Sequence, residues 1–176
     1  MSKNHQTVSG LTSWAQGVCQ EDQYKVFVDE ALPGETLSYE IYERKKNFAK
    51  ARILEIHEPS KSRTSPPCPY YSSCGGCQIQ HMSDSMQLAF KRQKVIDAFE
   101  RIAKVPSPNV EETLPSPKTF GYRNKIQLPV ALQKGHLTLG LYAKETHDII
   151  AIDSCLLHTP LSEKILKKIK PLLEKY

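Results

Sequence analysis

Three cysteines close together constrain this chain more than any other sequence feature. Cys68, Cys74 and Cys77 follow a C-x5-C-x2-C spacing in the stretch CPYYSSCGGCQIQH. Three thiolates from one loop can cover one face of a metal centre. Gly75 and Gly76 remove side chains where the backbone must turn tightly beside the sulfur atoms. The loop therefore predicts a metal site, and that site needs a fourth ligand.

Two residues compete for the fourth position. Cys155 ends the expected strand HDIIAIDSC and would complete a four-cysteine set from a distant part of the chain. His81 is the local competitor, because the spacing Cys77-x3-His81 is acceptable for zinc. Four thiolates suit a [4Fe-4S] cluster or zinc, whereas three thiolates and one imidazole suit zinc. The spacing does not decide between zinc and a [4Fe-4S] cluster. The fifth cysteine, Cys19, is expected to be a buried small side chain without a role in the site.

The cysteine content also bears on the compartment. The chain has five cysteines, and its first residues, MSKNHQTVSG, lack the apolar core of a signal peptide. Without a signal peptide, a cytoplasmic protein is expected. In such a reducing compartment, clustered thiols more often bind metal than form disulfides. The longest unbroken apolar run, IIAI, is far shorter than the roughly 20 residues that span a bilayer, which argues against a membrane partner.

The first third of the chain has the two-residue alternation of half-buried strands. In ETLSYEIYE every second residue is apolar, namely Leu37, Tyr39 and Ile41, and FAKARILEI alternates in the same way. These short strands leave no room for crossover helices between them. The pattern predicts an α+β protein that begins with a small, closed, antiparallel, OB-like β-barrel over residues 1–58.

The segment RKKNFAKAR joins two of these strands and has five basic residues and no acidic one. Such a cluster predicts a positive stripe that binds phosphates, although a hairpin whose lysines only contact solvent fits the composition equally well. A net charge of +5 is a mild bias in the same direction. A second basic group follows in the expected strand YRNKIQLPV. The candidate RNA-binding residues are Arg44, Lys45, Lys46, Lys50 and Arg52, with Arg123 and Lys125 as the second group.

The rest of the chain divides into a linker and a second domain. Residues 59–67, PSKSRTSPP, predict a linker, and residues 68–176 are expected to hold the cysteine loop, a helix and an incomplete α+β domain. The helix should begin at Ser83 or Asp84, and its apolar stripe should be core. That stripe consists of Leu88, Val95, Phe99 and Ile102. Antiparallel strands over YRNKIQLPV, HLTLGLYAKE and HDIIAIDSC, and a final helix capped by Thr159, complete the expected domain.

In this order, the features resemble the RNA (uracil-5-)-methyltransferases that modify 23S ribosomal RNA. CPYYSSCGGCQIQH closely resembles the iron-sulfur motif of that family. In the family the motif follows a TRAM β-barrel with a PGE turn and a basic strand, as DEALPGE and RKKNFAKAR do here. A helix and a strand beginning YRNK come after it, and this strand starts at Tyr122 here. The resemblance covers nearly the whole chain.

The resemblance implies that Cys68, Cys74, Cys77 and Cys155 bind a [4Fe-4S] cluster, which supports the structure and positions RNA. It also implies that a monomeric protein grips RNA, with ribosomal RNA the expected partner, through the barrel and the second β region. Family members use S-adenosylmethionine through a further α/β domain, and this chain has no Gly-rich turn of that type and ends before it. No catalytic residue is therefore expected here, and the chain should be inactive alone. The alternative is a free-standing, zinc-bound RNA-binding protein.

Overall fold

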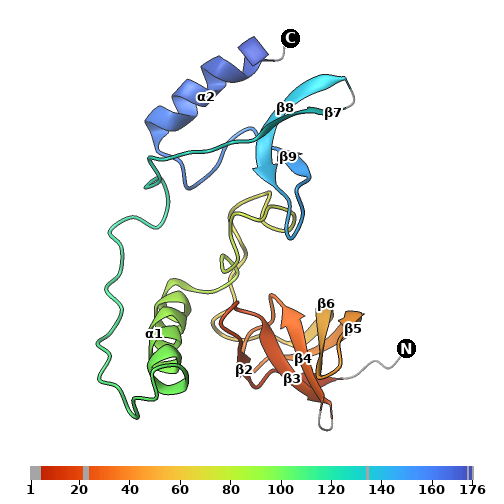
Figure 1. The fold of residues 1–176 in the computed structure, drawn as a ribbon, viewed down its shortest axis with the longest axis vertical. Helices are drawn as coiled ribbons and strands as arrows, with labels where there is room; N and C mark the ends of the chain where they lie inside the picture. Colours follow the sequence, from red (N-terminus) through yellow and green to blue (C-terminus); the bar gives the residue numbers. More distant parts are fainter. Residues whose placement is uncertain (1–4, 22–23, 134, 174, 176) are drawn as a thin grey trace. The chain divides into compact units, whose positions relative to one another are not determined.

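The computed structural model describes residues 5–21, 24–133, 135–173 and 175 (Figure 1). These residues form strands and two helices, which confirms the α+β part of the predicted fold class. By contacts the chain divides into two units, residues 1–65 with 79–114 and residues 66–78 with 115–176. None of the helices in the described ranges is long and apolar enough to cross a membrane.

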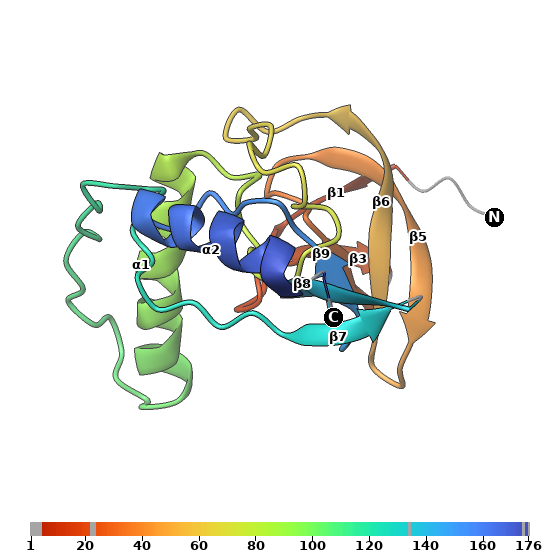
Figure 2. The same ribbon diagram turned by 90° about the horizontal axis from the view of Figure 1, so that it is seen from above.

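The first unit contains a six-stranded sheet in the order β1-β5-β6-β4-β3-β2. Its long neighbouring strands β5 and β6 curve together in Figure 2. The strands are β1 (Gln6–Thr7), β2 (Gly10–Leu11), β3 (Gly17–Glu21), β4 (Tyr24–Asp29), β5 (Thr36–Arg44) and β6 (Phe48–Glu58).

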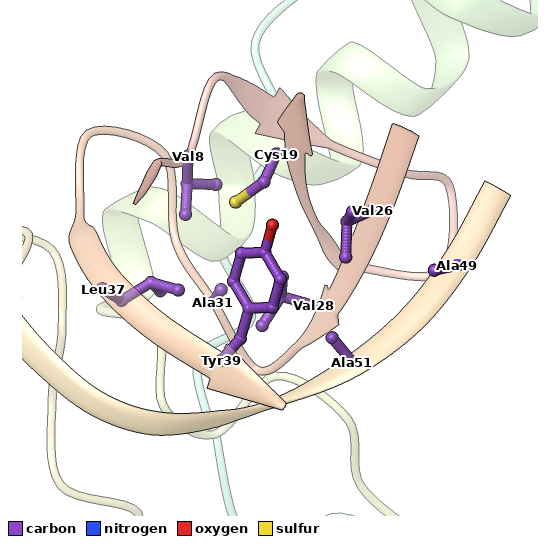
Figure 3. Packing of buried hydrophobic residues seen from close by; sticks show 9 residues of the cluster. All are labelled: Val8, Cys19, Val26, Val28, Ala31, Leu37, Tyr39, Ala49 and Ala51. Atoms are coloured by element: carbon purple, nitrogen blue, oxygen red, sulfur yellow. The ribbon is translucent and has the colours of Figure 1, made fainter. Parts of the chain in front are cut away.

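The sheet closes on itself because its two edge strands are almost continuous in the chain. Only Val8 and Ser9 separate β1 from β2. The Val8 N–H donates to the Glu35 carbonyl (2.9 Å), and the Ser9 N–H donates to the Val18 carbonyl (2.8 Å), so this segment contacts both ends of the strand order. Alternate side chains of the strands fill the interior, as predicted from their pattern. The core residues are Val8, Cys19, Val26, Val28, Ala31, Leu37, Tyr39, Ala49 and Ala51 (Figure 3).

One prediction for this sheet is wrong, since the strands are not all antiparallel. β4 and β6 pair in parallel, from Lys25 opposite Phe48 to Asp29 opposite Arg52. Alternation of apolar residues specifies which face each side chain occupies and says nothing about the direction of the neighbouring strand. Cys19 is fully buried, as expected, and burial together with the charge of Glu21 raises its pKa to about 11.

Helix α1 (Asp84–Arg101) begins as predicted, because the Ser83 Oγ caps it by accepting the Met86 N–H (3.3 Å). Its predicted core stripe is wrong: no residue of α1 is buried, and Phe99 remains 44% exposed. Only the first turns of the helix contact a core, where Met86 and Phe90 pack against a cluster of Ala15, Leu32 and Met82. These contacts place α1 in the first unit, whereas the sequence grouped it with the cysteine loop.

The segment expected to be a linker is held in place by a buried ion pair. Glu35 is fully buried, and its carboxylate accepts hydrogen bonds from the Arg63 Nε (2.5 Å) and Nη2 (2.7 Å). The backbone N–H groups of Leu32 and Ser60 also donate to it. Burial acts to raise the pKa of Glu35, but the bonds from Arg63 and the two N–H groups outweigh it and lower the pKa.

Residues on either side of the cysteine loop pair with each other. The Thr64 N–H donates to the His81 carbonyl (2.9 Å), and the Ser83 N–H donates to the Ser62 carbonyl (2.8 Å). Arg63 and Met82 form an antiparallel bridge between them. The loop over residues 66–78 is therefore an excursion whose two ends are joined at its base.

The second unit contains an antiparallel sheet in the order β7-β8-β9, as predicted, followed by helix α2. The strands are β7 (Val130–Gln133), β8 (His136–Tyr142) and β9 (Ile149–Ala151), and α2 spans Pro160–Leu173. The expected strand over YRNKIQLPV is wrong for its first eight residues, because β7 starts only at Val130. The backbone of Arg123 instead forms a parallel bridge with His158, and its N–H donates to the Leu157 carbonyl (2.8 Å).

Removal of the Arg63 side chain should destabilise the first unit strongly, because it leaves the Glu35 charge buried without its partner. We expect Arg63→Ala to lower the free energy of unfolding by about 3 kcal/mol or more, as for other broken buried pairs. Arg52→Ala is the matched control, since its pair with Glu40 is exposed and should be worth at most about 1 kcal/mol. Urea unfolding curves measure both values, and equal losses would contradict the prediction.

The same carboxylate should make the first unit sensitive to acid. The pKa of Glu35 in the folded chain lies below its ordinary value of 4.5. Its contribution is therefore present above about pH 4.5 and is lost as the pH falls through the folded-state pKa. We expect the stability gap between the wild type and Glu35→Gln to be widest at neutral pH and to narrow in acid. Urea unfolding at several pH values measures it, and a constant gap would show that the charge of Glu35 is not responsible.

Candidate metal centre and RNA interface

The four candidate cysteine ligands all belong to the second unit. Cys74 is buried, and Cys68, Cys77 and Cys155 are partly buried. The competing ligand, His81, belongs to the first unit and is 1% exposed. The four thiols thus come from two segments of one unit.

The cysteine loop is shaped by tight turns of its own backbone. The Tyr71 N–H donates to the Cys68 carbonyl (3.1 Å), and the Cys74 N–H donates to the Tyr70 carbonyl (2.7 Å). The Gly76 N–H points at the Cys74 Sγ (3.3 Å), which is the kind of contact that stabilises a thiolate ligand. Tyr71 is buried, and its hydroxyl donates to the Gln78 carbonyl (2.8 Å).

The loop packs against the connection that follows β8. Cys74 forms an antiparallel bridge with Ala143, and the Gly75 N–H donates to the Tyr142 carbonyl (2.9 Å). A Cβ atom at Gly75 would lie 3.1 Å from the Ala143 carbonyl oxygen. Glycine at this position therefore permits a close approach of two backbones, in addition to any turn beside the sulfur atoms. The Lys144 N–H closes the contact by donating to the Ser73 carbonyl (3.0 Å).

Cys155 reaches the neighbourhood of the loop from the turn between β9 and α2. The Asp153 N–H donates to the Tyr70 hydroxyl (3.1 Å), which links this turn to the loop. Burial raises the pKa of Cys155, and the thiols of Cys68 and Cys74 raise it further, against hydrogen bonds from the backbone of residues 157 and 158. The Cys155 thiol therefore lies within electrostatic range of the Cys68 and Cys74 thiols.

The side chains are not arranged as a finished metal site. In the described part of the chain, no group of three or more His, Cys, Asp or Glu side chains is placed to hold a metal ion. The donor types and their common unit fit a thiolate-bound centre, and the ligand set remains a prediction.

The predicted basic stripe is interrupted by acidic residues of the neighbouring strand. Glu43 lies opposite Lys50 and pairs with it (3.3 Å) and with Lys45 (2.5 Å). Glu40 lies opposite Arg52, which donates to it from Nε (2.8 Å) and Nη2 (2.6 Å). The hydrogen bonds from Lys45 and Lys50 lower the pKa of Glu43, so that carboxylate stays charged at neutral pH.

Two basic residues of the stripe remain available for another partner. Arg44 and Lys46 are exposed, and within the described ranges neither forms an ion pair. The Tyr24 hydroxyl hydrogen-bonds the carbonyls of Lys45 and Phe48, which fixes the hairpin that presents them. The hydroxyl thus contacts the backbone on both sides of Lys46 in the hairpin.

Two other groups complete the candidate RNA residues. Tyr42 is 46% exposed beside the stripe, with its hydroxyl donating to Asp29 (2.8 Å), so its ring is accessible for stacking. Phe48, the other aromatic residue near the stripe, packs against Phe27 (5.2 Å between centroids). The second basic group, Arg123 with Lys125, is exposed and lies in the second unit.

Sequence reasoning did not identify Tyr70 or Glu163 as supports of the cysteine site. The Tyr70 hydroxyl accepts a hydrogen bond from the Asp153 N–H (3.1 Å), and the Glu163 carboxylate accepts one from the Cys155 N–H (3.0 Å). The only signal for Glu163 in the sequence is an acidic residue in the first turn of a helix, which ordinarily indicates a favourable charge near the helix N-terminus. Its contact with Cys155 depends on the tertiary structure.

Comparisons with known proteins identify relatives over nearly the whole chain. A protein of Clostridium tetani named as an uncharacterized RNA methyltransferase is 40% identical over 169 residues, 96% of this chain and 36% of that protein. A Listeria innocua protein with the same description is 41% identical over 170 residues, 97% of this chain and 37% of its own length. No protein-family model matches the chain.

A solved structure is similar as well. The structure of Pyrococcus abyssi tRNA (uracil-54, C5)-methyltransferase, in complex with S-adenosyl-L-homocysteine, superposes with a TM-score of 0.66 and 28% sequence identity. The match covers 99% of this chain and 38% of the archaeal enzyme. The chain thus spans little more than a third of the length of the proteins it matches. Over that length, the predicted resemblance is confirmed: this chain is related to RNA methyltransferases.

Proposed function

We propose that this chain is the RNA-binding, [4Fe-4S]-containing part of an S-adenosylmethionine-dependent RNA (uracil-5-)-methyltransferase that acts on ribosomal RNA. The observation that carries the proposal is the 40% identity to a protein named an RNA methyltransferase over 96% of the chain. The structural likeness to a tRNA (uracil-54, C5)-methyltransferase supports uracil as the target base. Its bound S-adenosyl-L-homocysteine supports S-adenosylmethionine as the methyl donor.

The cluster ligands in this proposal are Cys68, Cys74, Cys77 and Cys155. Their location in one unit supports this set, as does the electrostatic coupling of Cys155 to Cys68 and Cys74. A bound cluster would join the loop to the end of β9 and stabilise the folded second unit, because binding free energy at a structural centre is also folding free energy. We assign it no part in methyl transfer.

RNA binding in this proposal involves both units. The closed sheet of the first unit is a small barrel of the TRAM or OB type, an architecture that commonly binds single-stranded nucleic acid. Arg44 and Lys46 would contact phosphates, and Tyr42 would stack on a base. Arg123 and Lys125 would add contacts from the second unit. We assign no catalytic residue among these 176 residues, which match little more than a third of the length of the related proteins.

The cluster can be tested by spectroscopy on anaerobically purified protein. We expect a brown protein with broad visible absorbance and about four iron and four sulfide ions per chain. Cys155→Ala should lose the colour and the iron, since it removes one ligand. Cys19→Ala is the matched control, because it removes a buried thiol from the first unit and should keep both. A colourless protein that contains zinc and loses it in His81→Ala would instead favour the zinc-bound alternative.

The RNA interface can be tested by changing its charges in both directions. Arg44→Ala with Lys46→Ala should weaken RNA binding and flatten its salt dependence, with the slope falling by about 0.7 for each phosphate that is no longer neutralised. Glu40→Gln with Glu43→Gln should strengthen binding, because it frees Lys45, Lys50 and Arg52 from their acidic partners.

Fluorescence anisotropy at several salt concentrations, with a ribosomal RNA fragment and a tRNA, measures both effects. Tighter binding of the tRNA would overturn the assignment to ribosomal RNA. If both double variants bind like the wild type, the interface is not on this hairpin. Substitution of Arg123 and Lys125 would then test the second unit.

A further inference from the structure

Several hydrogen bonds hold the turn over residues 155–158, which contains Cys155. The Cys155 carbonyl accepts the His158 N–H (3.0 Å), which closes the turn. On one side, the Gly121 N–H donates to the Leu156 carbonyl (2.8 Å). On the other side the chain enters α2 directly after Thr159, and the Glu163 N–H donates to the Thr159 carbonyl (3.1 Å).

Glu163 is the side chain at the centre of this arrangement. Its Oε1 accepts the Cys155 N–H (3.0 Å) and hydrogen-bonds the Nδ1 of His158 (2.7 Å). The His158 side chain is only 3% exposed, and that of Glu163 is 18% exposed. One carboxylate oxygen thus joins the first turn of α2 to both ends of the Cys155 turn.

The other oxygen of the carboxylate shows that this arrangement has a cost. Glu163 Oε2 is buried, and within the described ranges it has no hydrogen-bond partner. A buried oxygen without a partner disfavours the folded state, so the two bonds to Oε1 must offset that penalty. A residue that served only the helix N-terminus would not need to be buried at all.

We propose that Glu163 is a positioning residue for the fourth cysteine: it holds the turn over residues 155–158 in the conformation that presents Cys155 to the cysteine loop. The inference rests on the proposed cluster for its function, and its structural part holds for the metal-free chain as well. Cys155 is distant in sequence from Cys68, Cys74 and Cys77, so bringing it to them costs conformational entropy. If the turn is already ordered in the folded chain, its conformational entropy is lost during folding. Metal binding then costs less conformational entropy.

This arrangement also makes α2 part of the metal site. The helix contributes Glu163 from its first turn, and the backbone of residues 121–123 supports the turn from the other side. Loss of the Glu163 carboxylate should therefore loosen Cys155 while leaving the other three cysteines unchanged.

Three variants of α2 test the proposal. Glu163→Ala removes the acceptor, Glu163→Gln keeps an oxygen at the same place, and Lys164→Ala is the control, an exposed neighbour on the same helix. The first measurement is the alkylation rate of each cysteine in the metal-free chain, read by peptide mass spectrometry. We expect Glu163→Ala to raise the Cys155 rate about tenfold relative to the Cys68 rate, as for loss of one or two hydrogen bonds. Glu163→Gln and Lys164→Ala should stay within about twofold of the wild type by the same reasoning.

The second measurement is the rate at which the loaded chain loses its visible absorbance to a chelator. We expect faster loss in Glu163→Ala alone. Equal alkylation ratios and equal loss rates in Glu163→Ala and Lys164→Ala would overturn the inference. So would a Glu163→Gln variant as impaired as Glu163→Ala, because the hydrogen-bond acceptor would then not be the cause.

The two measurements also separate this inference from the proposed function. If the wild-type chain binds no cluster, the proposed function fails, and the alkylation ratio still decides whether Glu163 positions Cys155. General unfolding of the second unit in Glu163→Ala would raise the Cys68 and Cys155 rates together. That result would contradict a specific role for Glu163.

Discussion

The ion pair between Glu35 and Arg63 is the contact on which the arrangement of this chain most depends. Glu35 lies at the end of the turn between β4 and β5, and Arg63 lies just before the cysteine loop. The pair therefore joins the six-stranded sheet to the segment from which the cysteine loop starts. Beside it, residues 62–64 pair with residues 81–83, so the loop begins and ends at one point of the first unit. A loop closed at its base has less conformational freedom to lose when its cysteines bind a metal.

In the second unit, hydrogen bonds also order the backbone at two of the candidate ligands. Cys74 is fixed by backbone pairing with Ala143, and Cys155 is fixed by the first turn of α2. The backbone at each of these two cysteines is thus held by one or two hydrogen bonds. The close approach at Gly75 explains why a small residue is needed there whether or not a metal is bound. The backbone that carries these two candidate ligands is therefore ordered by contacts within the second unit.

The charged residues of β5 and β6 show how composition can mislead. RKKNFAKAR has no acidic residue, yet three of its five cations lie beside Glu40 or Glu43 of the preceding strand. Strand pairing brings Lys50 opposite Glu43 and Arg52 opposite Glu40, and a count of charges along the chain cannot detect that pairing. The exposed stripe of α1 is a second case, because apolar spacing predicted a buried face and only Met86 and Phe90 contact a core. Periodicity identifies a helix and its apolar side, and the surrounding chain decides whether that side is covered.

The sequence by itself determined the local features: the strands with alternating residues, the helix that starts at Ser83, the buried Cys19 and the resemblance to RNA methyltransferases. Each depends on residues close together in the chain, where side-chain period and capping chemistry act directly. The tertiary structure decided the parallel pairing of β4 with β6, the late start of β7 at Val130, and the partners of Arg63 and Glu163. These features join residues far apart in sequence. Their energies come from burial and from hydrogen bonds that exist only once distant segments meet, and no local pattern encodes which segments those are.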